Sequence, residues 1–98
     1  MSGWFVYILR CVDNTLYTGI TTDLNRRLFE HNQTKKGAKY TRCRRPCRLV
    51  YHSSWSGRSE AAKEEYKIKK LTRREKEMLL KDFLEMIEIL DTKETECK

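Results

Sequence analysis

Strand-like and helix-like patterns of apolar residues follow one another along this chain, beginning with a hairpin. Residues 4–10 and 15–20 are rich in aromatic and β-branched side chains, and a short polar segment separates them. This pattern is typical of two antiparallel strands joined by a turn. The pairing would place Tyr7 and Tyr17 on adjacent strands, with hydroxyl groups close enough to meet. Ordinary cross-strand packing is the simpler explanation when these two tyrosines are considered alone.

The next segment has the spacing of an amphipathic helix. Thr22 or Asp23 has a side chain suited to cap a helix that runs to about His31. Leu24 and Leu28 lie one turn apart, so we expect both to face the core.

The remaining pattern predicts one more strand and two more helices. Residues 33–48 are polar and basic without a regular period and are expected to form a loop, and 49–52 are expected to form the third strand. A helix is expected over 60–71. The segment 72–75 matches a capping box, which starts another helix. Together these elements predict an α/β fold.

Length and charge limit the class of protein. Ninety-eight residues suffice for one small domain, which we expect to cover residues 1–90, with a disordered polar tail over 91–98. The 21 Lys and Arg exceed the 14 Asp and Glu, for a formal net charge of +7. This charge suggests nucleic acid as a partner, although a solvated basic surface is the alternative. No apolar run approaches the roughly 20 residues of a membrane span and no signal peptide is visible, so we expect a cytoplasmic protein.

The cysteines are expected to be free thiols. They are Cys11, Cys43, Cys47 and Cys97, and a reducing compartment argues against disulfides between them. Cys43 and Cys47 have no second cysteine pair nearby, so a structural zinc site with four ligands is not expected.

One carboxylate interrupts an apolar helix face. The helix after the third strand has an apolar stripe defined by Ala61, Ile68 and Leu71, and Glu65 lies on this stripe. A buried carboxylate costs free energy unless it is paired, protonated or bound to a metal. Glu65 is therefore a candidate ligand for a divalent cation. A salt bridge to Arg27 or to a lysine is the equally weighted alternative.

Five polar positions occur in an order and spacing that resemble a known family. The series is Val6-Tyr7-Ile8, then Tyr17-Thr18-Gly19 ten residues after the first motif, then Arg27, His31 and Glu65. It resembles the GIY-YIG nuclease superfamily, in particular its small stand-alone bacterial proteins, from the first strand to about residue 80. The resemblance implies a small three-stranded antiparallel sheet flanked by helices.

The resemblance also implies a metal-dependent endonuclease that hydrolyses phosphodiester bonds in DNA, for example in repair or on particular DNA structures. Glu65 would bind Mg²⁺ or Mn²⁺, Arg27 would neutralise charge on the phosphate, and His31 would relay a proton or bind phosphate. Tyr7 or Tyr17 would be the general base, once a neighbouring cation lowers its pKa from about 10. The sequence leaves this choice open, with Tyr17 preferred.

Nucleic acid is expected to approach beside these residues. Gly19 permits close approach of a backbone, and the basic loop offers Lys39, Arg42, Arg44 and Arg45 to phosphates. No additional DNA-binding domain is recognisable, so target choice falls to this domain or to a protein partner. The oligomeric state stays open.

Two departures from the superfamily pattern support a second function class. Val6 replaces the first glycine of the signature, which is a mild change within a strand. No asparagine follows Asn32, whereas many longer nucleases of the superfamily carry one after the glutamate helix. The alternative is therefore a nucleic-acid-binding module with a weak or inactive nuclease site.

Overall fold

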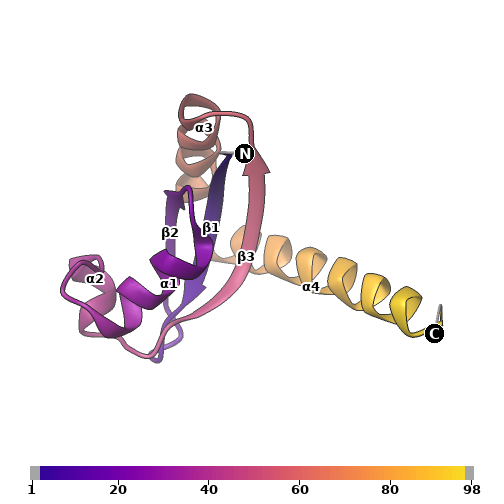
Figure 1. Ribbon diagram of the computed structural model, residues 1–98, viewed down its shortest axis with the longest axis horizontal. Coiled ribbons are helices and arrows are strands. Elements are labelled where there is room, and N and C mark those ends of the chain that lie inside the picture. The colour runs from indigo at the N-terminus through magenta and orange to yellow at the C-terminus, as the bar shows by residue number, and fades with distance from the viewer. Residues whose placement is uncertain (1–2, 97–98) are drawn as a thin grey trace.

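A three-stranded sheet with helices packed against it forms the body of the protein (Figure 1). The computed structural model describes residues 3–96, with side chains described through Ile87. In chain order the elements are β1 (Trp4–Arg10), β2 (Leu16–Thr21), α1 (Leu24–Gln33), α2 (Lys39–Arg42), β3 (Arg48–Trp55), α3 (Arg58–Lys70) and α4 (Arg73–Glu96). The expected α/β fold with a small antiparallel sheet is confirmed.

β1 is the central strand and β2 is an edge of the sheet. The strand order is β2-β1-β3, and both pairings are antiparallel. Tyr7 of β1 lies opposite Gly19 of β2 and opposite His52 of β3. Because successive residues of a strand point to opposite faces, Tyr7 belongs to one face of the sheet and its neighbour Val6 to the other.

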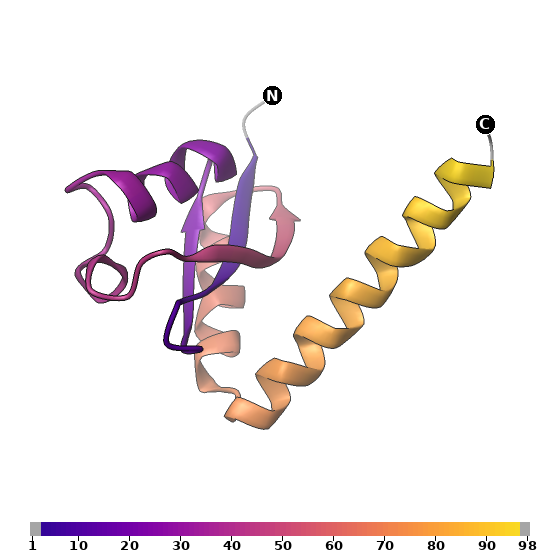
Figure 2. The same ribbon diagram turned by 90° about the horizontal axis from the view of Figure 1, so that it is seen from below.

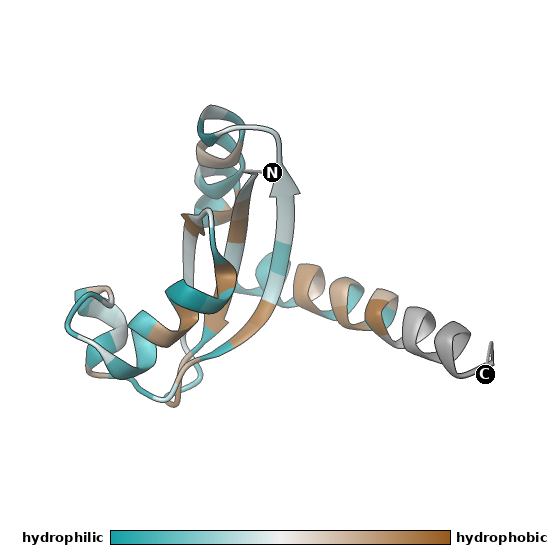
Figure 3. Cartoon of the chain, in the orientation of Figure 1, coloured by the Kyte–Doolittle hydropathy of each residue, from teal (hydrophilic) through white to brown (hydrophobic). Residues whose placement is uncertain are grey.

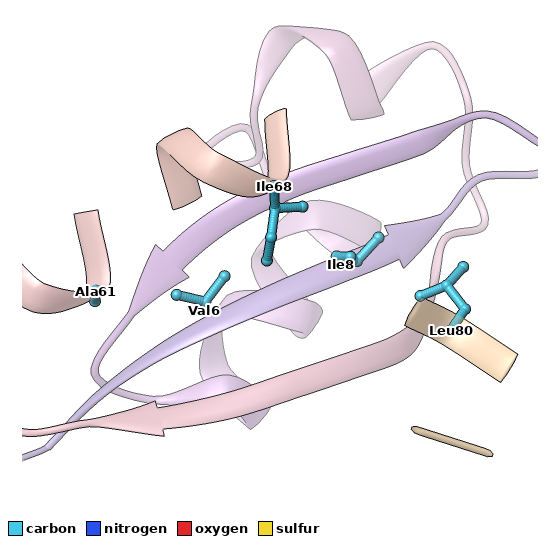
Figure 4. Packing of buried hydrophobic residues seen from close by; sticks show 5 residues of the cluster. All are labelled: Val6, Ile8, Ala61, Ile68 and Leu80. Carbon is cyan, nitrogen blue, oxygen red and sulfur yellow. The ribbon is translucent and has the colours of Figure 1, made fainter. Parts of the chain in front are cut away.

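The larger apolar cluster joins one face of the sheet to α3 and the start of α4. Its buried members, shown in Figure 4, are Val6, Ile8, Ala61, Ile68 and Leu80. Full burial of one aliphatic side chain stabilises the fold by about 1.5–3 kcal/mol. This packing holds α3 against β1 and β2, and it fixes the position of Glu65, which lies between Ala61 and Ile68 in the sequence.

A second cluster covers the opposite face of β1. Tyr7 and Leu9 are buried there, and the partly buried Leu24 and Leu28 of α1 pack against them. The expectation that these two leucines face the core is confirmed. α1 therefore lies over the face that carries Tyr7.

The predicted helix caps are present in two places. The Asp23 side chain accepts a hydrogen bond from Arg26 N at 3.0 Å and so starts α1. Thr72 N donates to Glu75 Oε1 at 2.8 Å, and Glu75 N donates to Thr72 Oγ1 at 3.2 Å. This reciprocal pair is the capping box expected at the start of α4.

The region expected to be a loop is more ordered than its composition suggests. It contains the four-residue helix α2, which begins after Ala38 without a side-chain cap. The third strand also extends over 48–55, beyond the predicted 49–52. In both places tertiary contacts decide the structure where the local pattern carries little information.

The tail expected to be disordered from residue 91 is instead helical as far as Glu96. No glycine or proline follows Gly57 in the sequence, so no residue breaks the helix that the capping box begins. Residues 97 and 98, including Cys97, lie outside the described part. Figures 1 and 2 show α4 leaving the sheet and ending on the side away from α1 and α2, and Figure 3 shows hydrophobic residues along its described portion. None of the described helices is long and apolar enough to cross a membrane.

Candidate active site

Tyr7 occupies the space beside Gly19, at the edge strand of the sheet. A β-carbon built on Gly19 would lie 2.6 Å from Tyr7 Oη and 2.8 Å from its Cζ. Such distances leave no room for any side chain. The sequence suggested that Gly19 allows nucleic acid to approach, whereas the structure shows that it makes room for the phenol of the neighbouring strand.

A buried chain of polar side chains links β1, α1 and α2. Tyr7 Oη lies 2.8 Å from His31 Nε2, and His31 Nδ1 lies 2.8 Å from Thr41 Oγ1. Tyr7 is 2 % exposed, and His31 and Thr41 are both 0 % exposed. Because these side chains are almost completely shielded from solvent, the polar chain depends mainly on internal hydrogen bonds.

Burial determines the protonation states of the first two members of this chain. Burial, partly offset by a hydrogen bond with Arg27, raises the pKa of Tyr7 to about 12. Burial and the positive charge of Arg27 lower the pKa of His31 to about 4. At neutral pH the phenol keeps its proton and the imidazole is uncharged. A neutral imidazole has one nitrogen free to accept, so Tyr7 donates its hydroxyl hydrogen to His31 Nε2.

Because His31 is neutral in the fold, we expect the protein to become less stable as the pH is lowered. Its pKa is about 6.5 in an unfolded chain and about 4 in the fold, so between these values the unfolded chain binds a proton that the folded chain does not. From pH 7 to pH 5 the free energy of unfolding should decrease by about 2 kcal/mol, measured by urea unfolding. His31→Gln, which cannot titrate, should show a clearly smaller decrease. An equal decrease in both proteins would contradict the assignment.

Arg27 lies beside Tyr7 and is partly engaged within the fold. Its Nη1 donates to Glu30 Oε1 and to Lys36 O, each at 2.9 Å. Burial opposes its charge, but hydrogen bonds with Glu30 and Tyr7 raise its pKa, so the guanidinium stays charged. Because the first two bonds use Nη1, the other nitrogens remain for Tyr7 and for a phosphate oxygen.

Tyr17 belongs to the same group of rings. Its ring centroid lies 5.2 Å from that of His31 and 6.4 Å from that of Tyr7. The ring of Tyr40 stacks on Tyr17 with centroids 5.9 Å apart, and the Arg44 guanidinium lies 4.0 Å from the Tyr40 centroid. The position of the Tyr17 ring is thus supported by residues that the sequence placed in an unstructured loop.

Glu65 approaches this group from α3. Its Oε2 lies 3.3 Å from Lys69 Nζ, and its side chain is 22 % exposed, so the salt bridge to a lysine that the sequence left open is present. Burial is the main influence on the pKa of Tyr7, and the negative charge of Glu65 raises it further. Lys69 is largely exposed, and such a pair contributes at most about 1 kcal/mol.

The donor groups around Glu65 suit a cation that keeps most of its water. Among the described residues, no three His, Cys, Asp or Glu side chains come together, which argues against zinc in this part of the chain. Mg²⁺ commonly binds one or two carboxylates and retains several waters. A half-buried Glu65 carboxylate fits this pattern.

The basic loop divides into exposed and engaged side chains. Lys39 and Arg42 are exposed. Arg44 Nε donates to Asp13 Oδ2 at 3.0 Å. Arg45 turns into the fold and donates to carbonyl oxygens at the carboxyl end of α1. Its guanidinium therefore holds the loop against α1, and we leave it out of the proposed nucleic-acid contact.

Cavities elsewhere in the fold do not contain the candidate residues. One of about 300 Å³ lies near Arg10 and Cys47, and another of about 540 Å³ lies between β3 and α4. The first contains two of the cysteines, Cys11 and Cys47, which are buried free thiols with their Sγ atoms 3.4 Å apart. The candidate site is instead the convergence of polar side chains beside β2.

A comparison with family models identifies the family of the chain. The model of the GIY-YIG catalytic domain matches residues 3–78. The chain belongs to the GIY-YIG family. Tyr7, Tyr17, Arg27, His31 and Glu65 all lie in the matched segment, which is a nuclease domain by family.

Relatives of this GIY-YIG protein are small bacterial proteins named UPF0213. One from Desulfotalea psychrophila is 58 % identical over 79 residues, which are 81 % of this chain and 72 % of the relative. One from Staphylococcus epidermidis is 48 % identical over 82 residues, covering 84 % of this chain and 99 % of the relative.

Solution structures of two similar proteins share the fold. The UPF0213 protein BH0048 from Bacillus halodurans is 48 % identical with a TM-score of 0.53, covering 81 % of this chain and 83 % of that chain. The protein EF2693 from E. faecalis is 46 % identical with a TM-score of 0.59, covering 85 % and 88 %.

Sequence patterns missed two side chains that this GIY-YIG domain places in its site. Thr41 binds His31, and Tyr40 stacks on Tyr17. Both belong to α2, where four residues are too few to show a helical period. Gly37 is the residue in the sequence that could have indicated a close contact between the loop and α1. A β-carbon there would lie 2.8 Å from His31 Cα. A glycine at this point lets the loop pass close to α1.

Substituting alanine for Gly19 of β2 should disrupt the candidate site by displacing the side chain of Tyr7 on the neighbouring strand. The new β-carbon would push Tyr7 away from His31, and we expect a loss of stability of about 1–3 kcal/mol. Gly3→Ala is the matched control, because its nearest neighbour would be Trp55 O at 3.6 Å. Urea unfolding measures the effect, and a wild-type free energy of unfolding for Gly19→Ala would contradict this role.

Proposed function

We propose that this GIY-YIG protein is a metal-dependent endonuclease that hydrolyses phosphodiester bonds in DNA. The observation that carries the proposal is the 2.8 Å hydrogen bond between Tyr7 Oη and His31 Nε2, with Arg27 close enough to influence the pKa of both groups. A phenol, an imidazole and a guanidinium at one place can move a proton and stabilise negative charge.

Tyr7 is better placed than Tyr17 to act as the general base. As Tyr7 takes a proton from the attacking water, its own proton can pass to His31 Nε2, which already accepts its hydrogen bond. In the free chain the pKa values of about 12 and about 4 oppose this transfer. A phosphodiester bound at Arg27 brings negative charge that weakens the influence of Arg27 on His31, and so favours the transfer.

Arg27 and Glu65 supply the electrostatic part of the mechanism. Arg27 would donate its free guanidinium hydrogens to a phosphate oxygen, where negative charge grows during attack. The Glu65 carboxylate would hold Mg²⁺ or Mn²⁺. When bound, the ion supplies a Lewis acid for the phosphate and a positive charge that lowers the pKa of a nearby phenol. GIY-YIG nucleases are generally dependent on divalent metals.

Cleavage assays test this proposal directly. Supercoiled plasmid and labelled duplex, flap and branched DNA would be incubated with the protein and Mg²⁺ or Mn²⁺. We expect slow, metal-dependent cleavage of at least one substrate and none in the presence of chelator. If no substrate is cut in either metal, the endonuclease proposal is overturned.

The second candidate is a nucleic-acid-binding module with a weak site. It is favoured by the lack of an asparagine after Asn32. On this account Lys39 and Arg42 hold the phosphate backbone while the buried polar chain serves mainly the fold.

Binding to DNA should weaken steeply as salt rises under either candidate. The net charge of +7 and the exposed Lys39 and Arg42 motivate this expectation, because neutralising phosphates releases counterions. Fluorescence anisotropy at 50 and 200 mM salt measures it, and replacing both side chains by alanine should reduce the slope by about 1–2. Arg45→Ala is not a suitable test of phosphate binding, because the Arg45 side chain is bonded to carbonyl groups at the end of α1. Equal affinity at both salt concentrations would speak against a nucleic-acid role.

A further inference from the structure

We propose that Thr41 fixes the tautomer of His31 and is thereby a positioning residue of the site. Its effect on rate rests on the proposed nuclease function, whereas its effect on His31 does not. Thr41 is fully buried on α2, and its Oγ1 lies 2.8 Å from His31 Nδ1. Its hydroxyl bonds the imidazole of His31 and the carbonyl of Ala38, so it acts through the imidazole.

The direction of each hydrogen bond follows from the partners. Thr41 has one hydroxyl hydrogen, and Oγ1 lies 2.9 Å from the carbonyl oxygen of Ala38, which can only accept. Thr41 therefore accepts from His31 Nδ1–H. Tyr7 in turn donates to Nε2. Each hydrogen in the series from Tyr7 through His31 and Thr41 to Ala38 O is used once.

The opposite tautomer fits this geometry less well. It would let the backbone N–H of Ala38 donate to Nδ1, but that distance is 3.4 Å, near the limit for a hydrogen bond. It would also turn Nε2–H toward the hydroxyl of Tyr7. The protonated phenol would then lose the acceptor that it has in the structure, which leaves a buried donor without a partner.

The path of the loop explains how Thr41 comes to this position. A β-carbon on Gly37 would lie 2.7 Å from Glu30 O and 2.8 Å from His31 Cα, so the loop lies directly against α1. From there α2 begins within two residues and turns Thr41 toward the ring. Because the tautomer determines whether Nε2 can accept the phenolic proton, Thr41 controls whether the proton path from Tyr7 exists.

Nitrogen NMR of the histidine rings tests the assignment without any activity. The chain has two histidines, His31 and His52, so the spectrum of ¹⁵N-histidine-labelled protein is assigned with the single variant His52→Gln. At pH 7 we expect His31 to carry its hydrogen on Nδ1. Thr41→Ser keeps the hydroxyl and should preserve this form. Thr41→Val has a similar shape without the hydroxyl and should shift the population toward Nε2–H.

Cleavage kinetics then show whether the tautomer matters for the reaction. Thr41→Val should lower kcat by roughly 10- to 10²-fold with KM unchanged, and Thr41→Ser should stay close to wild type. Finding His31 in the Nε2–H form in the wild type would overturn the proposal even if Thr41→Val fails to fold. An unchanged tautomer in a folded Thr41→Val would overturn it too. Absence of cleavage by the wild type would count against the nuclease function and would leave the NMR result intact.

Discussion

Nicking in the presence of Mg²⁺ should fall to the level of the chelator control when Glu65 is replaced by alanine. In the described part of the chain, Glu65 does not belong to any group of three or more His, Cys, Asp or Glu side chains that could hold the ion together. Loss of this group would therefore remove the main protein contact of the ion and the Lewis acid that depends on it. Binding of Mn²⁺, followed by electron paramagnetic resonance, should weaken in the same variant.

Two control substitutions separate metal binding from the helix itself. Glu64→Ala removes the adjacent carboxylate of α3 and should cleave like the wild type. Lys69→Ala breaks the 3.3 Å salt bridge to Glu65, and because an exposed pair contributes little, it should change stability by no more than about 1 kcal/mol and leave nicking in place. If Glu65→Ala cleaves normally while binding less Mn²⁺, the metal role is wrong.

Tyr7→Phe should reduce the cleavage rate by about 10²- to 10⁴-fold, the usual range for loss of a general base. The variant keeps the ring and its packing but removes the hydroxyl that lies 2.8 Å from His31 Nε2. It also leaves a buried acceptor without a donor, which costs about 1–3 kcal/mol, so rates must be compared at a temperature where both proteins are folded.

Tyr17→Phe is the matched comparison. Tyr17 was the preferred base from sequence, but the structure gives its ring a stacking partner in Tyr40 and gives the hydrogen bond with His31 to Tyr7. We expect a smaller rate loss than for Tyr7→Phe. Single-turnover cleavage measures both. If both variants cleave at the wild-type rate, the tyrosines serve packing alone and the proposed mechanism is wrong.

Much of the fold could be predicted because local patterns and tertiary contacts agree. The alternating strands, the Asp23 cap and the capping box at Thr72 are all specified within a few residues. The members of the candidate site could also be predicted, since they occur at intervals that resemble a family motif. Their convergence in space depends on how β1, β2, α1 and α3 pack together, which the sequence alone does not specify.

What could not be predicted depends on contacts between distant residues. Thr41 lies ten residues from His31, and nothing in a basic loop distinguishes a threonine that binds a buried ring from one in solvent. Arg45 shows the same difficulty. Its charge suggested a phosphate contact, yet its donors bind carbonyl groups at the end of α1. Gly19 was noticed for its backbone, while its role comes from the ring opposite it.

The length of α4 has a practical consequence for directing this protein to chosen sites. The helix has 24 residues, so it spans roughly 36 Å, close to one turn of duplex DNA. It leads away from α1 and α2, where the candidate site lies (Figure 2). A sequence-reading module fused beyond it would therefore be held at the far end of a helical spacer, away from the candidate site.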